Sequence, residues 1–212
     1  MKLKDVIFLG DSITEGSGAS APEKCYVSLI AKEEDFRDVY NGGIGGTRIS
    51  RQNEPVNDKH RYDIDFNVRL NTLPEKADYV VVFGGTNDYG HGDAPLGEVG
   101  EINPYTFAGA VRLLAINLRN KYGYGRTRFV LPLKRYNPDK LSISGHTLKE
   151  YVDVMKKVLE LEGIPYLDLF EKGLDEPLTE NDEGYFADGL HPNDKGHEWL
   201  AKAIADFIRE TE

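Results

Sequence analysis

Five short apolar runs divide the chain, and in most of them the hydrophobic residues are continuous instead of alternating with polar ones. A continuous run is typical of a strand buried on both faces, as in a parallel sheet. The first run has four apolar residues in succession, from Val6 to Leu9. The pattern therefore predicts strands at residues 5–10, 38–43, 78–85, 128–133 and 165–170.

The segments between these runs have apolar residues at helical spacing. In one of them the steps are four, three and four, so the side chains line one face of a helix: Phe107, Val111, Leu114 and Leu118. Asn103 and Pro104 look like the cap and first-turn proline of that helix, and Ser20 like the cap of an earlier one. We predict helices at residues 22–35, 103–123, 144–163 and 193–210, and a weaker helix at 63–73.

Strands that alternate with helices predict an α/β fold, an open and doubly wound sheet with helices on both sides. We expect residues 1–212 to form a single domain, since the sequence has no internal repeat and no convincing linker. In such sheets the functional site lies outside the carboxyl ends of the strands. The long loops at 47–62, 89–102, 134–144 and 171–188 begin near those ends and are placed to surround one site.

The composition and net charge of the chain limit the classes of molecule that it is expected to bind. The chain has 212 residues, 40% of them hydrophobic, and a formal net charge of -10. An acidic surface repels nucleic acid and anionic lipid, so we expect neither as a partner. No apolar run approaches the ~20 residues that span a membrane, and the first strand begins without a signal-peptide pattern. We expect a cytoplasmic protein in which the single cysteine, Cys25, packs in the core.

Four polar clusters follow predicted strands or precede the last helix. They are Gly10-Asp11-Ser12, the segment 41–47 (NGGIGGT), the segment 84–88 (GGTND) and the segment 188–192 (DGLHP). The carboxyl ends of parallel strands meet at one edge of a sheet, so these clusters are expected to converge there.

Together the clusters contain the groups that acyl transfer needs. The Ser12 hydroxyl is a weak nucleophile and needs a base, which His191 can supply. Asp188, three residues earlier, can hold His191 in one tautomer and stabilise its charged form. Donors for the oxyanion are the backbone N–H groups of Ser12 and Gly46 and the side-chain amide of Asn87.

This ordered set resembles the SGNH hydrolases, also called the GDSL esterase/lipase family, whose four blocks carry Ser, Gly, Asn and His in this order. The resemblance spans nearly the whole chain and implies a flavodoxin-like three-layer α/β/α sandwich with a five-stranded parallel sheet. It implies a nucleophile at Ser12, a base at His191 with Asp188 as its partner, and an oxyanion hole of Ser12, Gly46 and Asn87. Ile13 stands where the family name implies leucine, a mild apolar change. Gly42, Gly43 and Gly45 compete with Gly46 for the second block.

Each cluster also has a simpler interpretation. Gly-Asp-Ser is a common turn composition, His191 could cap the last helix, and Asn87-Asp88 could be a plain turn. His91 with Asp93 resembles a metal pair but lacks a third ligand. The glycine cluster lacks the dinucleotide-binding register. The remaining histidines are predicted to be solvated or packed: His60, His91, His146 and His197.

The sequence predicts a serine esterase that acts through an acyl-enzyme on short, acetyl-like esters, with a carbohydrate as one candidate alcohol. The alternatives are a lysophospholipase or thioesterase of the same family, or a binding module that no longer turns over. No metal or cofactor is expected, and the oligomeric state stays open. Asp11, which we also interpret as a structural turn residue, is a candidate substrate contact together with Thr47, Tyr89 and Tyr136. Tyr62 and Tyr185 lie in or beside the loops and could also stack on sugar rings.

Overall fold

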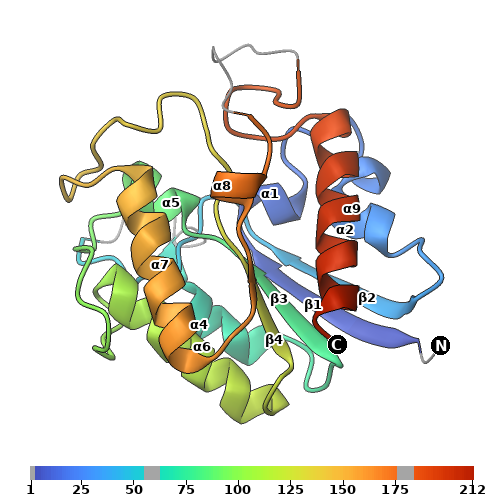
Figure 1. Ribbon diagram of the computed structural model, residues 1–212, viewed down its shortest axis with the longest axis horizontal. Helices are drawn as coiled ribbons and strands as arrows, with labels where there is room; N and C mark the ends of the chain where they lie inside the picture. Colours follow the sequence, from blue (N-terminus) through green and yellow to red (C-terminus); the bar gives the residue numbers. More distant parts are fainter. Residues whose placement is uncertain (1–2, 55–62, 176–183) are drawn as a thin grey trace.

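A computed structural model describes residues 3–54, 63–175 and 184–212 of the chain. Its centre is a five-stranded, all-parallel sheet in the order β2-β1-β3-β4-β5 (Figure 1). The strands are β1 (Lys4–Gly10), β2 (Phe36–Gly43), β3 (Tyr79–Phe83), β4 (Thr127–Val130) and β5 (Tyr166–Leu167). This strand order is that of flavodoxin-like folds, so the predicted α/β class and sheet are confirmed.

The continuous apolar runs are explained by a core on each face of the sheet. In β1, Ile7 and Leu9 pack into one core while Val6 and Phe8 pack into the other. Since successive side chains of a strand point to opposite faces, both sets must be apolar when both faces are covered.

Helices form the two outer layers (Figure 1). One face carries α4 (Phe66–Arg69), α6 (Phe107–Tyr122) and α7 (Leu148–Glu162), whose apolar sides build the first core. The other face carries α2 (Tyr26–Ile30) and α9 (Asp194–Glu210), which pack against each other and on the second core. The molecule is therefore a three-layer α/β/α sandwich.

The described elements are completed by three short α-helices, α1 (Ser12–Glu15), α5 (Thr86–His91) and α8 (Leu169–Lys172), and by two 3-10 turns, η1 (Pro22–Lys24) and η2 (Leu70–Thr72). Both α1 and α5 begin within three residues of a strand end, at the carboxyl edge of the sheet. No helix in the three described ranges has the length and apolar character needed to cross a bilayer.

Several predicted boundaries are wrong, and local capping explains why. The helix predicted at 22–35 is only η1 followed by α2, and Ser20 does not cap it but binds Asp194. Helix α6 begins at Phe107 because Asn103 and Pro104 belong to a preceding turn, in which the Asn103 side chain accepts from the Tyr105 N–H. The weak helix at 63–73 is reduced to α4 and η2.

Three predicted strands are too long, and one of them, β4, ends at Val130 instead of residue 133. β3 ends at Phe83, since Gly85 adopts a left-handed conformation (φ +106°) and caps α5. β5 ends at Leu167, and Asp168 caps α8 through the Glu171 N–H. The predicted end of α7 at Gly163 and the start of α9 after Asn193 are confirmed, whereas α7 begins at Leu148 and not at residue 144, because Thr147 caps it.

Candidate active site

The loop after β1 is shaped to display Ser12. A Cβ on Gly10 would lie 1.9 Å from Thr14 Oγ1, so only glycine lets α1 follow the strand this closely. Asp11 caps α1, its carboxylate accepting the Ile13 N–H at 3.0 Å. Gly16 ends the helix in a left-handed conformation (φ +112°). Ser12 is consequently held at the first position of a four-residue helix, at the carboxyl edge of the sheet.

Ser12, His191 and Asp188 form a continuous hydrogen-bonded chain. His191 Nε2 lies 3.0 Å from Ser12 Oγ, and His191 Nδ1 lies 2.6 Å from Asp188 Oδ2. The other oxygen of Asp188 accepts the backbone N–H groups of Leu190 and His191, at 3.1 and 2.7 Å. Three residues predicted from clusters 179 positions apart in the chain are thus brought together.

A tight turn allows Asp188 to reach a histidine only three residues away. Gly189 has a φ of +73°, which favours glycine, and Phe186 pairs with Pro192 in an antiparallel bridge. Burial alone would raise the pKa of Asp188, but hydrogen bonds from the backbone and side chain of His191 outweigh it and lower the pKa. Asp188 is therefore ionised at neutral pH and can orient the imidazole.

The second block lies beside the end of β1. The Ile44 N–H donates to the Gly10 carbonyl at 3.1 Å, which ties this loop to the Ser12 turn. Gly42 and Gly43 lie inside β2, and the Gly45 N–H donates to Glu15 at 2.8 Å. Gly46 has a φ of +76°, and within the described residues its N–H has no hydrogen-bond partner. Of the four competing glycines, Gly46 is the one best placed to offer a donor.

Asn87, the second residue of α5, contacts the same loop. Its Nδ2 donates to the Thr47 carbonyl at 3.0 Å, and its Oδ1 lies 3.2 Å from His91 Nε2. The amide has two N–H donors, so one remains after the bond to Thr47.

His91 sets the orientation of this amide. Arg48 Nη1 lies 2.8 Å from His91 Nδ1, and a guanidinium only donates, so Nδ1 accepts and the ring proton is on Nε2. Nε2–H then donates to Asn87 Oδ1 and leaves Nδ2 facing Thr47. Burial, and after it the charge of Arg48, lowers the pKa of His91, which keeps the ring neutral.

From the sequence, His91 is predicted only to be solvated, packed or half of a metal pair. The structure does not support the metal pair, since Asp93 instead accepts the backbone N–H groups of Asn53 and Glu54. The described residues contain no group of three or more potential protein ligands for a metal. The signal that could have revealed the real contact is the spacing of four between Asn87 and His91, which places both on one helix face.

Two further buried groups brace the site and were not predicted. Arg69 donates to the Gly10 carbonyl and to Thr47 Oγ1, at 2.8 and 2.6 Å, and also to the Gly42 carbonyl. It therefore joins the ends of β1 and β2 to the Gly46 loop. Asp88 accepts the N–H groups of Ile49 and Ser50, at 3.0 and 2.8 Å, and burial raises its pKa.

Two predicted substrate contacts are buried. Thr47 has no exposed surface, and its hydroxyl donates to the Ile44 carbonyl at 2.6 Å. Asp11 is 2% exposed, and burial raises its pKa to about 7. Neither side chain has a surface open to a substrate, so the structure does not support either residue as a substrate contact.

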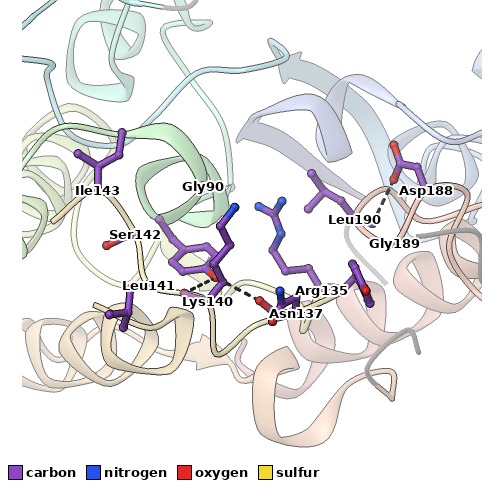
Figure 2. A pocket seen from close by; sticks show the side chains of 12 residues that line it. Gly90, Arg135, Asn137, Lys140, Leu141, Ser142, Ile143, Asp188, Gly189 and Leu190 are labelled. Atoms are coloured by element: carbon purple, nitrogen blue, oxygen red, sulfur yellow. Dashed lines mark hydrogen bonds between the residues drawn. The ribbon is translucent and has the colours of Figure 1, made fainter. Parts of the chain in front are cut away.

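The two predicted tyrosines line a cavity of about 310 Å³ next to Asp188 (Figure 2). Tyr89 is 5% exposed and its hydroxyl donates to the Lys140 carbonyl at 2.7 Å, so it mainly holds the loop that carries Lys140. Tyr136 is 40% exposed and its N–H donates to the Gly189 carbonyl at 2.7 Å. Tyr185 is exposed and does not line this cavity, and Tyr62 lies outside the described residues.

The remaining histidines in the described ranges are engaged away from Ser12. His197 is fully buried and stacks on Tyr26 at 6.1 Å between ring centroids. His146 lies 3.1 Å from Glu150 at the start of α7. His60 lies outside the described residues. Cys25 is buried, as predicted.

Comparison with known proteins connects this geometry to a family. The model of the GDSL-like lipase/acylhydrolase family matches residues 8–199. Among curated proteins, none matches the chain.

Solved structures share the fold. A protein from Lactobacillus plantarum is 28% identical, with 99% of this chain and 98% of that one covered and a TM-score of 0.83. A possible lipase from Chitinophaga pinensis is 20% identical, with 98% of each chain covered and a TM-score of 0.74. A two-domain esterase active on acetylated mannans is 20% identical, with 99% of this chain and 50% of that one covered and a TM-score of 0.58.

Proposed function

The chain belongs to the GDSL-like lipase/acylhydrolase family, and we propose that within it the protein is a serine esterase acting through an acyl-enzyme. The observation that carries the proposal is the hydrogen-bonded chain from Ser12 through His191 to Asp188. The family resemblance inferred from the four sequence blocks is confirmed by the family match. It supports hydrolase chemistry, and we infer the roles of the individual residues from the geometry.

In the first half of the reaction, Ser12 Oγ attacks the ester carbonyl carbon while His191 Nε2 accepts the hydroxyl proton. The carbonyl electron pair moves onto oxygen to give a tetrahedral oxyanion. Collapse of this species breaks the bond to the alcohol oxygen, which takes the proton from His191. Asp188 holds the imidazole through Nδ1 and stabilises its positive charge while it exists.

In the second half, water takes the place of the alcohol. His191 accepts a proton from the water, whose oxygen attacks the acyl carbon. The bond to Ser12 Oγ breaks, Oγ regains its proton from His191, and the acid leaves. The net change is hydrolysis of one ester bond.

The oxyanion is stabilised by the N–H groups of Ser12 and Gly46 and by the free N–H of Asn87. Donors held in place before the reaction lower the barrier because they need no reorganisation, and each contributes on the order of 3 kcal/mol. The bond from His91 to Asn87 Oδ1 keeps the amide from rotating, which would present its oxygen to the negative charge.

We propose short acyl groups, acetyl above all, on a polar alcohol such as a carbohydrate. The cavity beside Asp188 is lined mainly by polar and charged residues, with exposed Tyr136 as a surface on which a sugar ring could stack. The two-domain esterase of the same fold that is active on acetylated mannans also supports an acetylated carbohydrate as the substrate. The net charge of -10 supports a small-molecule ester as the partner instead of nucleic acid or membrane, and the single cysteine supports a cytoplasmic location.

The test combines active-site labelling with a chain-length series. Wild type, Ser12→Ala and the control Ser28→Ala, on α2, are incubated with an activated phosphonate and with 4-nitrophenyl esters of two to twelve carbons. We expect labelling of wild type and Ser28→Ala only, a loss of about a thousandfold or more in kcat for Ser12→Ala, and a preference for the shortest esters.

Other outcomes separate the alternatives. A wild type that is neither labelled nor active supports a binding module. Preference for long acyl chains supports a lysophospholipase, and preference for a thioester over the matched oxygen ester supports a thioesterase. Equal activity of Ser12→Ala and wild type refutes the serine mechanism.

A further inference from the structure

Arg135 differs from the other arginines in the described ranges, because it has no carboxylate, carbonyl or other hydrogen-bond partner there. The other nine each bind a carboxylate or a backbone carbonyl: Arg37, Arg48, Arg51, Arg69, Arg112, Arg119, Arg126, Arg128 and Arg209. In a chain with a net charge of -10, acidic partners are abundant, so a half-buried guanidinium without one stands out. Burial lowers the pKa of Arg135, in agreement with the lack of a stabilising anion.

The guanidinium lines the cavity beside the proposed catalytic residues. Figure 2 shows Arg135 between the segment 140–143 and Leu190. Asp188, Gly189 and Leu190 form one wall of the cavity, and His191 follows directly in the chain. Asp188 lines this cavity together with Arg135 and also holds His191 Nδ1 at 2.6 Å, so a group bound to Arg135 would lie on the Asp188 side of the proposed catalytic residues.

The surroundings hold Arg135 in this cavity without neutralising it. Its guanidinium carbon lies 5.7 Å from the centre of the Tyr89 ring, whose hydroxyl is fixed by the Lys140 carbonyl. Gly90 leaves the space that Arg135 occupies, since a Cβ there would lie 2.9 Å from Nη1. The guanidinium is thus positioned by packing, which leaves its N–H groups available.

The other charges around the cavity leave an anion site open. Asp188 attracts Arg135, but its two oxygens already accept bonds from His191 and Leu190. Lys140 adds a second cation to the lining, and within the described residues it has no ion pair either. Asp139, next to it in the chain, is exposed and not part of the lining.

We propose that this cavity is a subsite for a carboxylate carried by the ester substrate, with Arg135 as the residue that binds it. Arg135 presents a planar fork of donors that matches a carboxylate, and a charge-assisted pair of this kind is stronger than neutral hydrogen bonds. The inference rests on the proposed esterase function and narrows its substrates to esters with a negative group near the scissile bond.

The test compares charged and neutral esters of nearly the same shape. 4-Acetoxybenzoate and its methyl ester place the charge on the alcohol side, while 4-nitrophenyl succinate and its methyl ester place it on the acyl side. For each pair, the preference is kcat/KM of the charged ester divided by kcat/KM of the neutral one. It is measured for wild type, Arg135→Gln, Arg135→Lys and Lys134→Gln, at low and high salt.

Lys134→Gln is the matched control. It removes the same charge from the adjacent position, but Lys134 lies over the Phe170 ring and does not line the cavity. We expect Arg135→Gln to lower the preference by about tenfold or more in one of the two pairs, with Arg135→Lys intermediate and Lys134→Gln like wild type. Salt should lower the wild-type preference in the same pair.

Equal preferences in wild type and Arg135→Gln for both pairs overturn the subsite, as does a parallel loss on charged and neutral esters, which indicates a packing role beside Tyr89. Either result leaves the proposed function intact as long as wild type hydrolyses the neutral esters. The pair that responds identifies whether the cavity receives the alcohol or the acyl half of the substrate.

Discussion

The Asn87 side chain depends on its neighbours for the direction of its amide. Its oxygen and nitrogen have nearly the same shape, so packing alone does not choose between the two orientations. The orientation is set by His91 and Arg48. The Arg48 guanidinium can only donate to His91 Nδ1, so the His91 proton is on Nε2 and is donated to Asn87 Oδ1. Asp63 in turn forms an ion pair with Arg48 at 2.8 Å. This ion pair therefore helps to fix the orientation of the Asn87 amide in the proposed oxyanion hole.

The first prediction at this scale concerns His91. His91→Met removes the donor to Asn87 Oδ1, so the amide can rotate, and we expect kcat to fall by about ten- to a hundredfold with little change in KM. His91→Gln can place an N–H near the position of Nε2 and should recover much of the loss. The measurement is steady-state kinetics on a short 4-nitrophenyl ester.

A double-mutant cycle distinguishes positioning from general destabilisation. If His91 acts through Asn87, adding His91→Met to Asn87→Ala should cost almost nothing further, because the amide it orients is already gone. Additive losses would show that His91 affects the reaction by another route.

At the scale of single elements, helix ends decide where the predicted and observed boundaries differ. Apolar spacing located α6, α7 and α9, because a helix that covers a sheet must present an apolar stripe. It did not reveal that Asn103 turns the chain before α6, since the same residue types cap helices and close turns. Where a cap has two reciprocal bonds, as at Thr147 and Glu150, the observed start is sharply defined.

The second prediction tests that cap. Thr147 Oγ1 accepts the Glu150 N–H, and Glu150 accepts the Thr147 N–H at 2.7 Å. Thr147→Ala should lower the free energy of unfolding by about 1 kcal/mol, measured by urea denaturation, and Thr147→Ser should retain most of it. Esterase activity should be unchanged, since Thr147 neither lines the cavity nor takes part in the hydrogen bonds that join Ser12, His191 and Asp188. Equal stability of the alanine and serine variants would contradict the capping role.

At the scale of the whole molecule, the parallel sheet explains why Ser12, Asn87, Asp188 and His191 could be found from sequence. Each follows a recognisable strand or precedes a recognisable helix, and topology brings those ends together. Arg69, Arg48 and Arg135 could not be assigned in the same way. Their partners, or in Arg135 the absence of any among the described residues, depend on contacts between loops that no local pattern encodes.

The buried carboxyl group of Asp11 makes the stability of the whole molecule depend on pH. Burial raises its pKa from 3.8 to about 7, so between about pH 4 and 7 the folded state holds a proton that the unfolded state releases. The free energy of unfolding must then fall as the pH rises through this window, by about 1.4 kcal/mol for each unit.

Asp11→Asn keeps an oxygen for the Ile13 N–H and removes the titration. The free energy of unfolding of Asp11→Asn minus that of wild type, measured by urea denaturation, should therefore increase by about 2–3 kcal/mol between pH 5 and pH 8. Asp194→Asn is the control, because hydrogen bonds from Lys24 and Ser20 lower the pKa of this exposed carboxylate to about 2, and it does not titrate in that range. A difference between Asp11→Asn and wild type that stays constant from pH 5 to 8 would mean that Asp11 is ionised in the folded protein throughout.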